Sequence, residues 1–216
     1  MKFTAFLIFL ISCCHADEPL ILKKAMTGFS NQAQPNEGLE DELVSMMDED
    51  QAARQIDPKN VSKEERQRIG EIAAKHNIRL QEIVAEHGWP GIRLAGIKGS
   101  HAMWLLVQHQ DHDLAFQKRC LLLLKSAVDR QDDQYQNYAY LVDRVRKNEN
   151  RPQVYGTQWD FKEGKLRMFP VEDFANLNKR RLEAGLTTIE EYRDGFKAVL
   201  GFTDADLLLD PVKDIP

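Results

Sequence analysis

GSHAMWLLVQHQDHDLAFQ, residues 99–117, is the segment around which the rest of the chain is arranged. In a helix with about 100° per residue, His101, Gln108 and His112 fall within roughly 60° of one another and form a narrow polar stripe. The apolar residues between them point in several other directions, so this helix lacks the single wet face of a surface helix. We therefore expect it to be packed on most sides.

The polar side chains of this helix need partners if the helix is buried. A buried polar group without a hydrogen bond costs about 1–3 kcal/mol. The stripe is therefore either a satisfied internal network or the wall of a wet cavity. The first interpretation is structural and the second is functional, and the residues alone leave both open.

The first residues have the pattern of an export signal. Lys2 is followed by an apolar run, Phe3–Ile11, that is too short to cross a bilayer as a helix. Two cleavage patterns compete, because Cys13 fits a lipoprotein box and Ala16 fits ordinary cleavage before Asp17. We expect an exported protein that is periplasmic, secreted or lipid-anchored in the cell envelope, with membrane contact only through a lipid on Cys13.

Net charge limits the classes of partner, and cysteine content limits the disulfides that the chain can form. The net charge is −5, with 29 basic and 34 acidic side chains, which argues against nucleic-acid binding. We expect a small polar molecule or an envelope protein as the partner. Two of the three cysteines lie in the export segment, so the chain has no disulfide framework. Cys120 precedes four leucines, and we assign it to the core.

Hydrophobic periodicity predicts a mainly α fold, an antiparallel bundle-like domain with one β-hairpin. Ser62 and Glu65 have the spacing of a capping box at a helix start. The hairpin is expected near residues 154–169, because Val154–Phe161 alternates between apolar and polar side chains. The expected helices are 39–55, 62–77, 78–86, 101–112, 114–128, 132–145, 173–184 and 187–200.

The chain is expected to have four parts. Residues 1–16 form the signal, 17–38 a flexible tether, 39–200 a single domain and 201–216 a tail. Ile92–Ser100 contains two glycines, Gly96 and Gly99, and is expected to be a connecting loop. His76 is expected to lie at a helix end.

Several segments in the same order resemble a bacterial domain family of unknown function, over roughly Leu39 to Tyr192. The resemblance implies a shared fold and a shared polar site, and it carries over no activity. Gln110 departs from the small residue usual in the family's Gln-His-x-Asp motif, and we expect it on an outer face. The segments that carry the resemblance are Met47-Asp-Glu-Asp-Gln51, His87-Gly-Trp-Pro90, Gly99-Ser-His-Ala102, Val107-Gln-His-Gln-Asp111, Phe116-Gln117, Ala139-Tyr-Leu-Val-Asp-Arg144, Arg151-Pro-Gln-Val-Tyr-Gly-Thr-Gln158 and Arg180-Arg-Leu-Glu-Ala-Gly-Leu186.

One hypothesis for the site needs no metal. His109 would act as a general base, since histidine alone has an ordinary pKa near neutrality. Asp111 or Asp143 would orient it, and Arg144 would stabilise negative charge on the substrate. For the Asp143-Arg144 pair, the alternative is an ordinary ion pair at a helix end. The candidate ligand-binding residues are His101, Gln108, Gln117, Gln153, Tyr155, Gly156 and Gln158.

A second hypothesis places a metal at His109 and His112, whose i,i+3 spacing could direct two imidazoles to one ion. A third ligand is required, and Asp48, Asp50, Asp143 or His101 would have to supply it. No spacing in the sequence identifies one, and the sequence leaves the cofactor unknown.

Two functions follow from these residues. The first is a hydrolase-like enzyme that acts on a small polar substrate. The alternative is a non-catalytic binding or protein-interaction module of the cell envelope, in which the polar motifs are structural networks. In that case Tyr155 to Gln158 would be a packed hairpin strand, whereas Gly156 within a strand often marks the close approach of a ligand.

Overall fold

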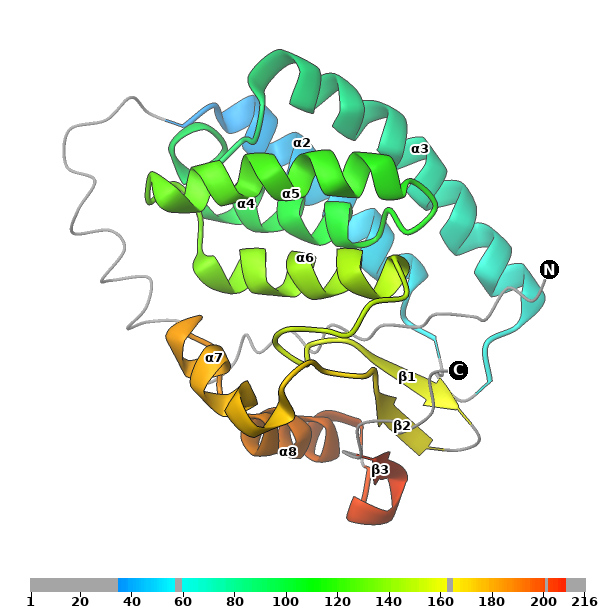
Figure 1. The fold of residues 1–216 in the computed structure, drawn as a ribbon. Helices are drawn as coiled ribbons and strands as arrows, with labels where there is room; N and C mark the ends of the chain where they lie inside the picture. The colour runs from blue at the N-terminus through cyan, green and yellow to red at the C-terminus, as the bar shows by residue number, and fades with distance from the viewer. Residues whose placement is uncertain (1–34, 57–59, 163–164, 201, 209–216) are drawn as a thin grey trace.

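The computed structural model of the protein describes residues 35–56, 60–162, 165–200 and 202–208. The fold has a layer of long helices and a smaller layer that contains the strands and the last helices (Figure 1). This confirms the predicted mainly α class with one β-hairpin. The helices of the first layer are α2 (Glu37–Ala53), α3 (Lys63–His87), α4 (Ile92–Gln108), α5 (Leu114–Asp129) and α6 (Tyr135–Asn148).

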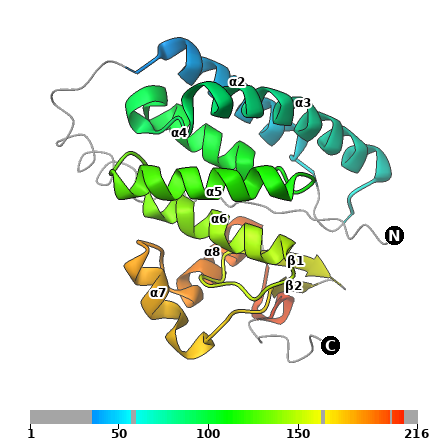
Figure 2. The same cartoon turned by 45° about the horizontal axis from the view of Figure 1, so that its top comes forward.

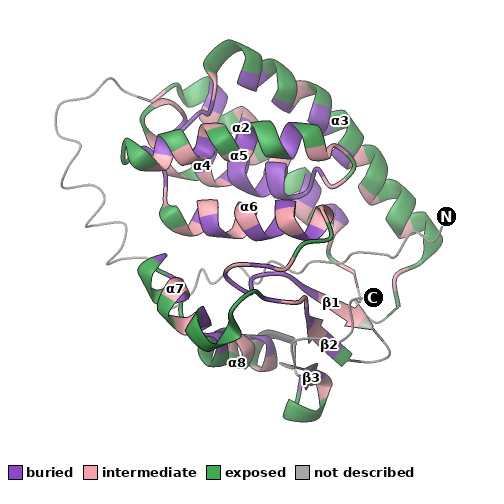
Figure 3. Cartoon of the chain, viewed as in Figure 1, coloured by how far each residue is buried: buried purple, intermediate pink, exposed green. Residues whose placement is uncertain are grey.

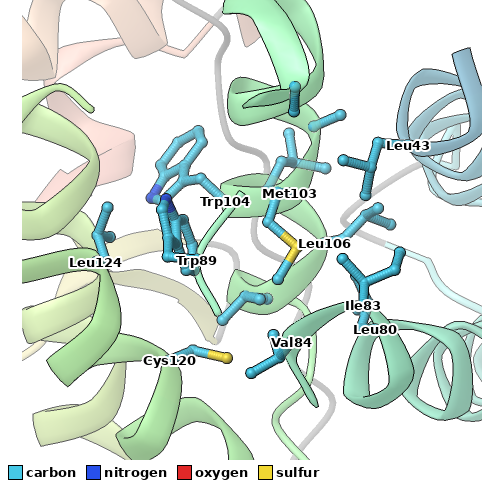
Figure 4. Packing of buried hydrophobic residues seen from close by; sticks show 14 of the residues in the cluster. Leu43, Leu80, Ile83, Val84, Trp89, Met103, Trp104, Leu106, Cys120 and Leu124 are labelled. Atoms are coloured by element: carbon cyan, nitrogen blue, oxygen red, sulfur yellow. The ribbon is translucent and has the colours of Figure 1, made fainter. Parts of the chain in front are cut away.

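Helix α4 lies at the centre of the helical layer, between α2 and α3 on one side and α5 and α6 on the other (Figure 2). Every residue from Ala102 to Gln108 is buried, so all sides of this part of the helix are covered (Figure 3). Met103 and Leu106 lie beside Leu43 of α2 and Ile83 of α3 in the main core (Figure 4). The expected burial of the central helix is therefore confirmed.

The second layer is built on a short hairpin. Strands β1 (Trp159–Lys162) and β2 (Lys165–Met168) pair antiparallel, and β3 (Leu207–Leu208) pairs parallel to β2. A separate core forms beneath the hairpin from α7 (Leu177–Glu183) and α8 (Ile189–Leu200), and the two 3-10 turns are η1 (Phe174–Asn176) and η2 (Asp204–Asp206).

Tyr140 of α6 connects the two cores. Its ring meets the ring of Trp104 at 5.6 Å and the ring of Tyr192 at 6.3 Å, in edge-on geometry both times. Such contacts are favoured by the charge distribution of aromatic rings. Helix α6 therefore packs against both layers, the helical layer on one side and the second layer on the other.

The first turn of α4 is held by the α5–α6 turn. The backbone carbonyl of Asp132 accepts the N–H of Ile92 at 2.8 Å, and its side chain accepts the N–H of Arg93 at 2.8 Å. These contacts satisfy donors that a helix start leaves unpaired. The expectation of a loop over Ile92–Ser100 is therefore wrong, because tertiary contacts outweigh the low helix propensity of its glycines.

Gly96 bends α4 near its start. Its φ is 68°, a conformation that favours glycine, and a Cβ atom there would lie 2.5 Å from a carboxylate oxygen of Glu40. The glycines of this segment thus shape a helix instead of a loop.

Asp133 binds the His87-Gly-Trp-Pro90 segment through the side chain of Trp89. Its Oδ2 accepts hydrogen bonds from Trp89 Nε1 and Ser100 Oγ, each at 2.7 Å, and its Oδ1 accepts one from Asn137 at 2.8 Å. The α3–α4 connection, α4 and α6 are thereby tied to one buried carboxylate. This segment therefore supports the fold.

Helix α3 is one continuous element, whereas two helices were expected. The capping box of Ser62 and Glu65 is present at its start, as predicted. His76 lies within the helix and is buried, so its expected place at a helix end is wrong. The ring reaches α2, where His76 Nε2 lies 2.8 Å from a carboxylate oxygen of Glu49, and this tertiary contact explains its burial.

The hairpin is shorter than expected, because β1 starts at Trp159 and residues 154–158 are irregular. Backbone N–H groups in that segment point to the side chain of Asp143 instead of to a neighbouring strand. Residues 202–208, expected as part of a loose tail, pack against the hairpin. Phe202 and Leu207 are both buried there.

Other expectations lie outside the described residues. The signal segment, most of the tether and residues 209–216 belong to this group, as do both cleavage sites. In the part of the chain that the structure describes, no helix is both long and apolar enough to cross a bilayer.

Candidate functional site

The candidate site forms where the carboxyl-terminal turns of three helices meet. Asp50 lies in the last turn of α2, His109 directly follows α4, and Arg144 lies in the last part of α6. All three side chains are buried. Residues far apart in the sequence are thus brought into one polar region between the helices.

His109 and Asp50 form a buried hydrogen-bonded pair. His109 Nδ1 lies 2.5 Å from Asp50 Oδ2, and their side chains are 1% and 2% exposed. Arg54, which caps the end of α2, donates from Nε to both carboxylate oxygens at 3.0 and 2.9 Å. Since an ionised carboxylate can only accept, the proton of the His109–Asp50 contact belongs to Nδ1.

The charges of this pair follow from its surroundings. Burial lowers the pKa of His109 to about 4, and the charge of Arg54 acts in the same direction. Burial would raise the pKa of Asp50, but its contacts with His109 and Arg54 outweigh this and hold the pKa well below its usual range. At neutral pH Asp50 is therefore ionised and His109 is neutral.

The second ring nitrogen of His109, Nε2, is the atom that could accept a proton. A neutral ring with its proton on Nδ1 has a lone pair on Nε2. This atom is buried, and among the described residues it has no hydrogen-bond partner. The arrangement has the parts that general-base catalysis requires, a proton acceptor and a group that fixes its orientation.

Asp111 and Arg144 form the second part of the site. Arg144 donates from Nε and Nη2 to the two oxygens of Asp111 at 2.7 and 2.6 Å, and from Nη1 to Gln158 Oε1 at 3.0 Å. The Arg144 side chain is 3% exposed, whereas that of Asp111 is 32% exposed. Asp111 is therefore the member of the ion pair that faces solvent.

Lys147 lies behind the same carboxylate. Its Nζ is 3.7 Å from Asp111 Oδ2, and its side chain is 5% exposed. Burial and the like charge of Arg144 lower the pKa of Lys147 to about 7, although Asp111 opposes this effect. These surroundings therefore favour the neutral amine of Lys147 more than water does.

Asn148 and Gln117 close the cluster. Asn148 donates from Nδ2 to Asp111 Oδ1 and to Gln117 Oε1, both at 2.8 Å. Gln117 in turn donates to the backbone carbonyls of Val107 and Gln108 at 3.1 and 3.2 Å. These bonds fix the end of α4 and with it the position of the next residue, His109.

The two clusters are electrostatic neighbours. The charge of Arg144 contributes to the lowered pKa of His109, and the charge of Asp50 acts on Arg144. The structure thus brings together six of the predicted residues, which are Gln108, His109, Asp111, Gln117, Arg144 and Gln158. The contact to His109 Nδ1, expected from Asp111 or Asp143, is made by Asp50 instead.

Asp143 binds the backbone of the segment that leads into β1. Its oxygens accept the backbone N–H groups of Val154, Tyr155 and Thr157 at 2.8 to 3.2 Å, and the Thr157 hydroxyl at 3.0 Å. Burial raises the pKa of Asp143, which these hydrogen bonds oppose. The carboxylate determines the path of the chain into β1, the segment that supplies Gln158.

Three predicted binding residues have structural partners. Gln153 donates to the carbonyls of Gln158 and Phe169 at 3.0 and 2.9 Å. The Tyr155 hydroxyl lies 3.3 Å from that of Tyr135. Gly156 has a φ of 65°, and a Cβ atom there would lie 3.1 Å from Met168 Sδ. The close approach expected at Gly156 is therefore made by the second core.

The remaining predicted residues differ in burial. His101 lies beside Trp104, with ring centres 5.2 Å apart. Gln108 is 1% exposed, and its Nε2 has no partner within the described ranges. The expectation that Gln110 lies on an outer face is wrong, because its side chain turns back to the Leu106 carbonyl at 3.0 Å and is buried.

The metal hypothesis gains no support from the described residues. His112 is exposed, whereas His109 is buried, so the pair does not converge as the spacing predicted. Among residues 35–56, 60–162, 165–200 and 202–208, no three His, Cys, Asp or Glu side chains gather as a metal site.

Sequence reasoning missed Arg54, Lys147 and Asn148, and it named Asp50 only as a secondary metal ligand. A usable signal existed in the helix periodicity. Asp50 and Arg54 are an i,i+4 pair, and Arg144, Lys147 and Asn148 share one face of α6. Which helix faces meet is a tertiary property that this periodicity leaves open.

Comparison with known proteins identifies a family for this chain. The model of a family described as "Family of unknown function (DUF6624)" matches residues 37–213. No curated protein and no solved structure matches the chain. The predicted resemblance to a family of unknown function is confirmed, and it extends beyond the range expected from the motifs.

Proposed function

Because this chain belongs to the DUF6624 family, whose function is unknown, we propose a function from its geometry, that of a hydrolase acting on a small polar substrate. The observation that carries the proposal is the buried Asp50–His109 pair with an unpartnered Nε2. An imidazole that is neutral at pH 7 and has a buried, oriented lone pair is suited to take a proton from water.

In the proposed reaction, His109 Nε2 accepts a proton from a water molecule as its oxygen attacks the substrate carbonyl. Asp50 holds the ring and stabilises the positive charge that develops on it. Arg54 keeps Asp50 ionised through its two contacts with the carboxylate. The proton then passes to the leaving group, and His109 returns to its neutral form.

Gln108 and Arg144 are assigned to the negative charge that develops on the substrate oxygen. Gln108 Nε2 is a buried donor beside His109 in the chain, without a partner in the described part of the protein. Arg144 adds positive charge close to His109. Charge stabilisation in a buried site is commonly a large part of catalysis. We place the entrance at Asp111, whose side chain is more exposed than that of its ion-pair partner Arg144.

The test is hydrolysis of p-nitrophenyl acetate by the purified protein and by His109→Asn. Asparagine can keep a donor toward Asp50 but lacks the lone pair of Nε2. We expect hydrolysis above the buffer blank, and a loss of about 10²–10⁴-fold in His109→Asn. His112→Asn is the matched control, since His112 is exposed three residues later, and it should keep the full rate. A wild-type rate equal to the blank, or an unchanged rate in folded His109→Asn, would refute the proposal.

One observation favours the alternative, a non-catalytic binding or interaction module. Asp111, Asp143 and Gln153 use their polar atoms on partners within the protein. On this view the motifs hold the fold, and the outer surface contacts a partner. An inactive wild type together with a large loss of stability in His109→Asn would favour it over the hydrolase.

We also propose that the protein works outside the cytoplasm, on the strength of the apolar run that follows Lys2. Mass spectrometry of the chain produced in a bacterium tests this. A first residue at Asp17 indicates ordinary cleavage, and a lipid-modified Cys13 indicates a lipoprotein. An intact chain that stays in the cytoplasm would count against export.

A further inference from the structure

We propose that Asp111 excludes anions from the candidate site, so that the substrate of the proposed hydrolase is a neutral molecule. This inference deepens the function proposed above and rests on it for the reaction. It is carried by the ion pairs that occupy the arginine side chains of the site and by the uncharged atoms that have no partner.

Arg144 is occupied by a carboxylate of the protein itself. It donates from Nε and Nη2 to the two oxygens of Asp111 at 2.7 and 2.6 Å, and from Nη1 to Gln158 Oε1 at 3.0 Å. A guanidinium group binds a carboxylate or a phosphate most strongly through two such parallel contacts. At Arg144 Asp111 holds that position, so an anionic substrate would have to displace it.

Arg54 is occupied in a similar way by Asp50. Its Nε lies 3.0 and 2.9 Å from the two carboxylate oxygens, and its Nη2 lies 2.9 Å from Oδ1. Burial would raise the pKa values of Asp50 and Asp111, but their contacts with neighbouring cations and donors outweigh this and hold both values well below the usual range. Both carboxylates are therefore ionised, and each arginine is in direct contact with a negative charge.

Lys147 belongs to the same network. Its Nζ lies 3.7 Å from Asp111 Oδ2, and the charge of Asp160 acts on it as well. The three cations of this region, Arg54, Arg144 and Lys147, thus face three carboxylates. Little net positive charge is left to attract an anion.

The partnerless atoms of the site are uncharged. In the described part of the chain, Gln108 Nε2 and His109 Nε2 are buried and have no hydrogen-bond partner. The first is an amide donor, and the second is an acceptor in the neutral ring. A neutral carbonyl oxygen can be satisfied by an amide donor, whereas a buried carboxylate needs a paired cation to offset its lost hydration. These atoms therefore suit a neutral ester or amide.

Asp111 also lies where we place the entrance. Its side chain is 32% exposed, whereas that of Arg144 is 3% exposed. An anionic substrate would meet the negative charge of Asp111 before it reached the buried cation. A like charge placed against the wrong ligand is a common means of specificity.

The test compares two activated esters that differ in charge, using the purified full chain at neutral pH. 4-Acetoxy-3-nitrobenzamide is neutral, and 4-acetoxy-3-nitrobenzoate has a carboxylate in place of the carboxamide. We expect kcat/KM for the neutral ester to be higher by about 10-fold or more, after correction for the rates in buffer.

Two variants assign this preference to Asp111. Asp111→Asn removes the repulsion and leaves Arg144 without its ionised partner, so the ratio of the two kcat/KM values should fall by about 10-fold. Asp129→Asn is the matched control, because it removes the same charge from a side chain that is 58% exposed, and it should keep the wild-type ratio.

A further measurement needs no hydrolysis. Sodium acetate at constant ionic strength should raise the unfolding temperature of Asp111→Asn, because an anion bound at Arg144 stabilises the folded state. It should leave the wild type unchanged, and acetamide, the neutral counterpart, should affect both proteins equally.

The possible outcomes separate this inference from the proposed reaction. A wild type that prefers the anionic ester or is stabilised by acetate would overturn the inference, and neither result needs a variant that folds. A folded Asp111→Asn protein without any response to acetate would overturn it as well. If the wild type hydrolyses neither ester, the proposed hydrolase fails, and the acetate measurements alone decide whether Asp111 excludes anions.

Discussion

His109 and Asp50 are separated by 59 positions in the chain, yet Nδ1 of one lies 2.5 Å from Oδ2 of the other. The contact joins the end of α4 to the last turn of α2. It also determines which ring nitrogen carries the proton and which carries the lone pair. The packing of two helices therefore sets the chemical state of the proposed base.

The first prediction concerns acid stability. The pKa of His109 is lowered to about 4 in the fold, whereas an unfolded histidine titrates near 6.5. Between these values the unfolded chain binds more protons, so the free energy of unfolding should fall as pH falls from 6.5 to 4, by on the order of 3 kcal/mol. Urea unfolding at several pH values measures this. His109→Asn should show a shallower dependence, and equal slopes would contradict the prediction.

The second prediction concerns the stability of the protein at alkaline pH. The pKa of Lys147 is lowered to about 7 in the fold, so between pH 7 and 10.4 the unfolded chain again binds more protons. The free energy of unfolding should therefore rise by on the order of 2 kcal/mol from pH 7 to 9. The same urea titration checks this. Lys147→Met should remove the rise, and a rise that persists in this variant would assign it to another group.

The third prediction concerns Asp143. Asparagine would place an NH₂ group against backbone donors that now point to a carboxylate oxygen, so Asp143→Asn should lower the free energy of unfolding by about 3 kcal/mol. Asp129→Asn is the matched control, because Asp129 is 58% exposed and pairs only at the surface with Lys125, and it should change stability by less than about 1 kcal/mol. Thermal or chemical unfolding distinguishes the two. Equal losses would show that Asp143 does not hold the loop.

The fourth prediction compares two glycines. Gly156→Ala forces a side chain into a φ of 65° and toward Met168, so it should destabilise the fold by about 2–3 kcal/mol. Gly70 lies inside α3, and a Cβ atom there would meet nothing within 4 Å. Gly70→Ala should therefore stabilise the protein by about 0.5–1 kcal/mol. Unfolding midpoints measured side by side should move in opposite directions.

Local patterns predicted most of the helices because the necessary information lies within a few residues. Ser62 and Glu65 marked the start of α3 correctly, since both halves of a capping box lie in the same turn. The start of α4 failed for the opposite reason. Its first turn is satisfied by Asp132, far along the chain, and its glycines misled the interpretation.

The sequence predicted several residues of the candidate site, but only some of the contacts between them. The polar residues of α4 and α6 could be recognised, and His109, Asp111 and Arg144 do lie together. Asp50 was named only as a secondary metal ligand, because the acidic residues around it gave it no distinction in the sequence. The role of Asp143 was hidden as well, since its partners are backbone N–H groups, which every residue except proline has.

The consecutive residues Asp132 and Asp133 have a consequence for how the molecule opens. They bind the first turn of α4, the Trp89 side chain and α6 at the same place, the turn between α5 and α6. Local opening of that turn would release all of these contacts together. Amide hydrogens of Ile92 and Arg93 should thus exchange with solvent each time this turn opens, and they should do so at similar rates because both are bonded to Asp132.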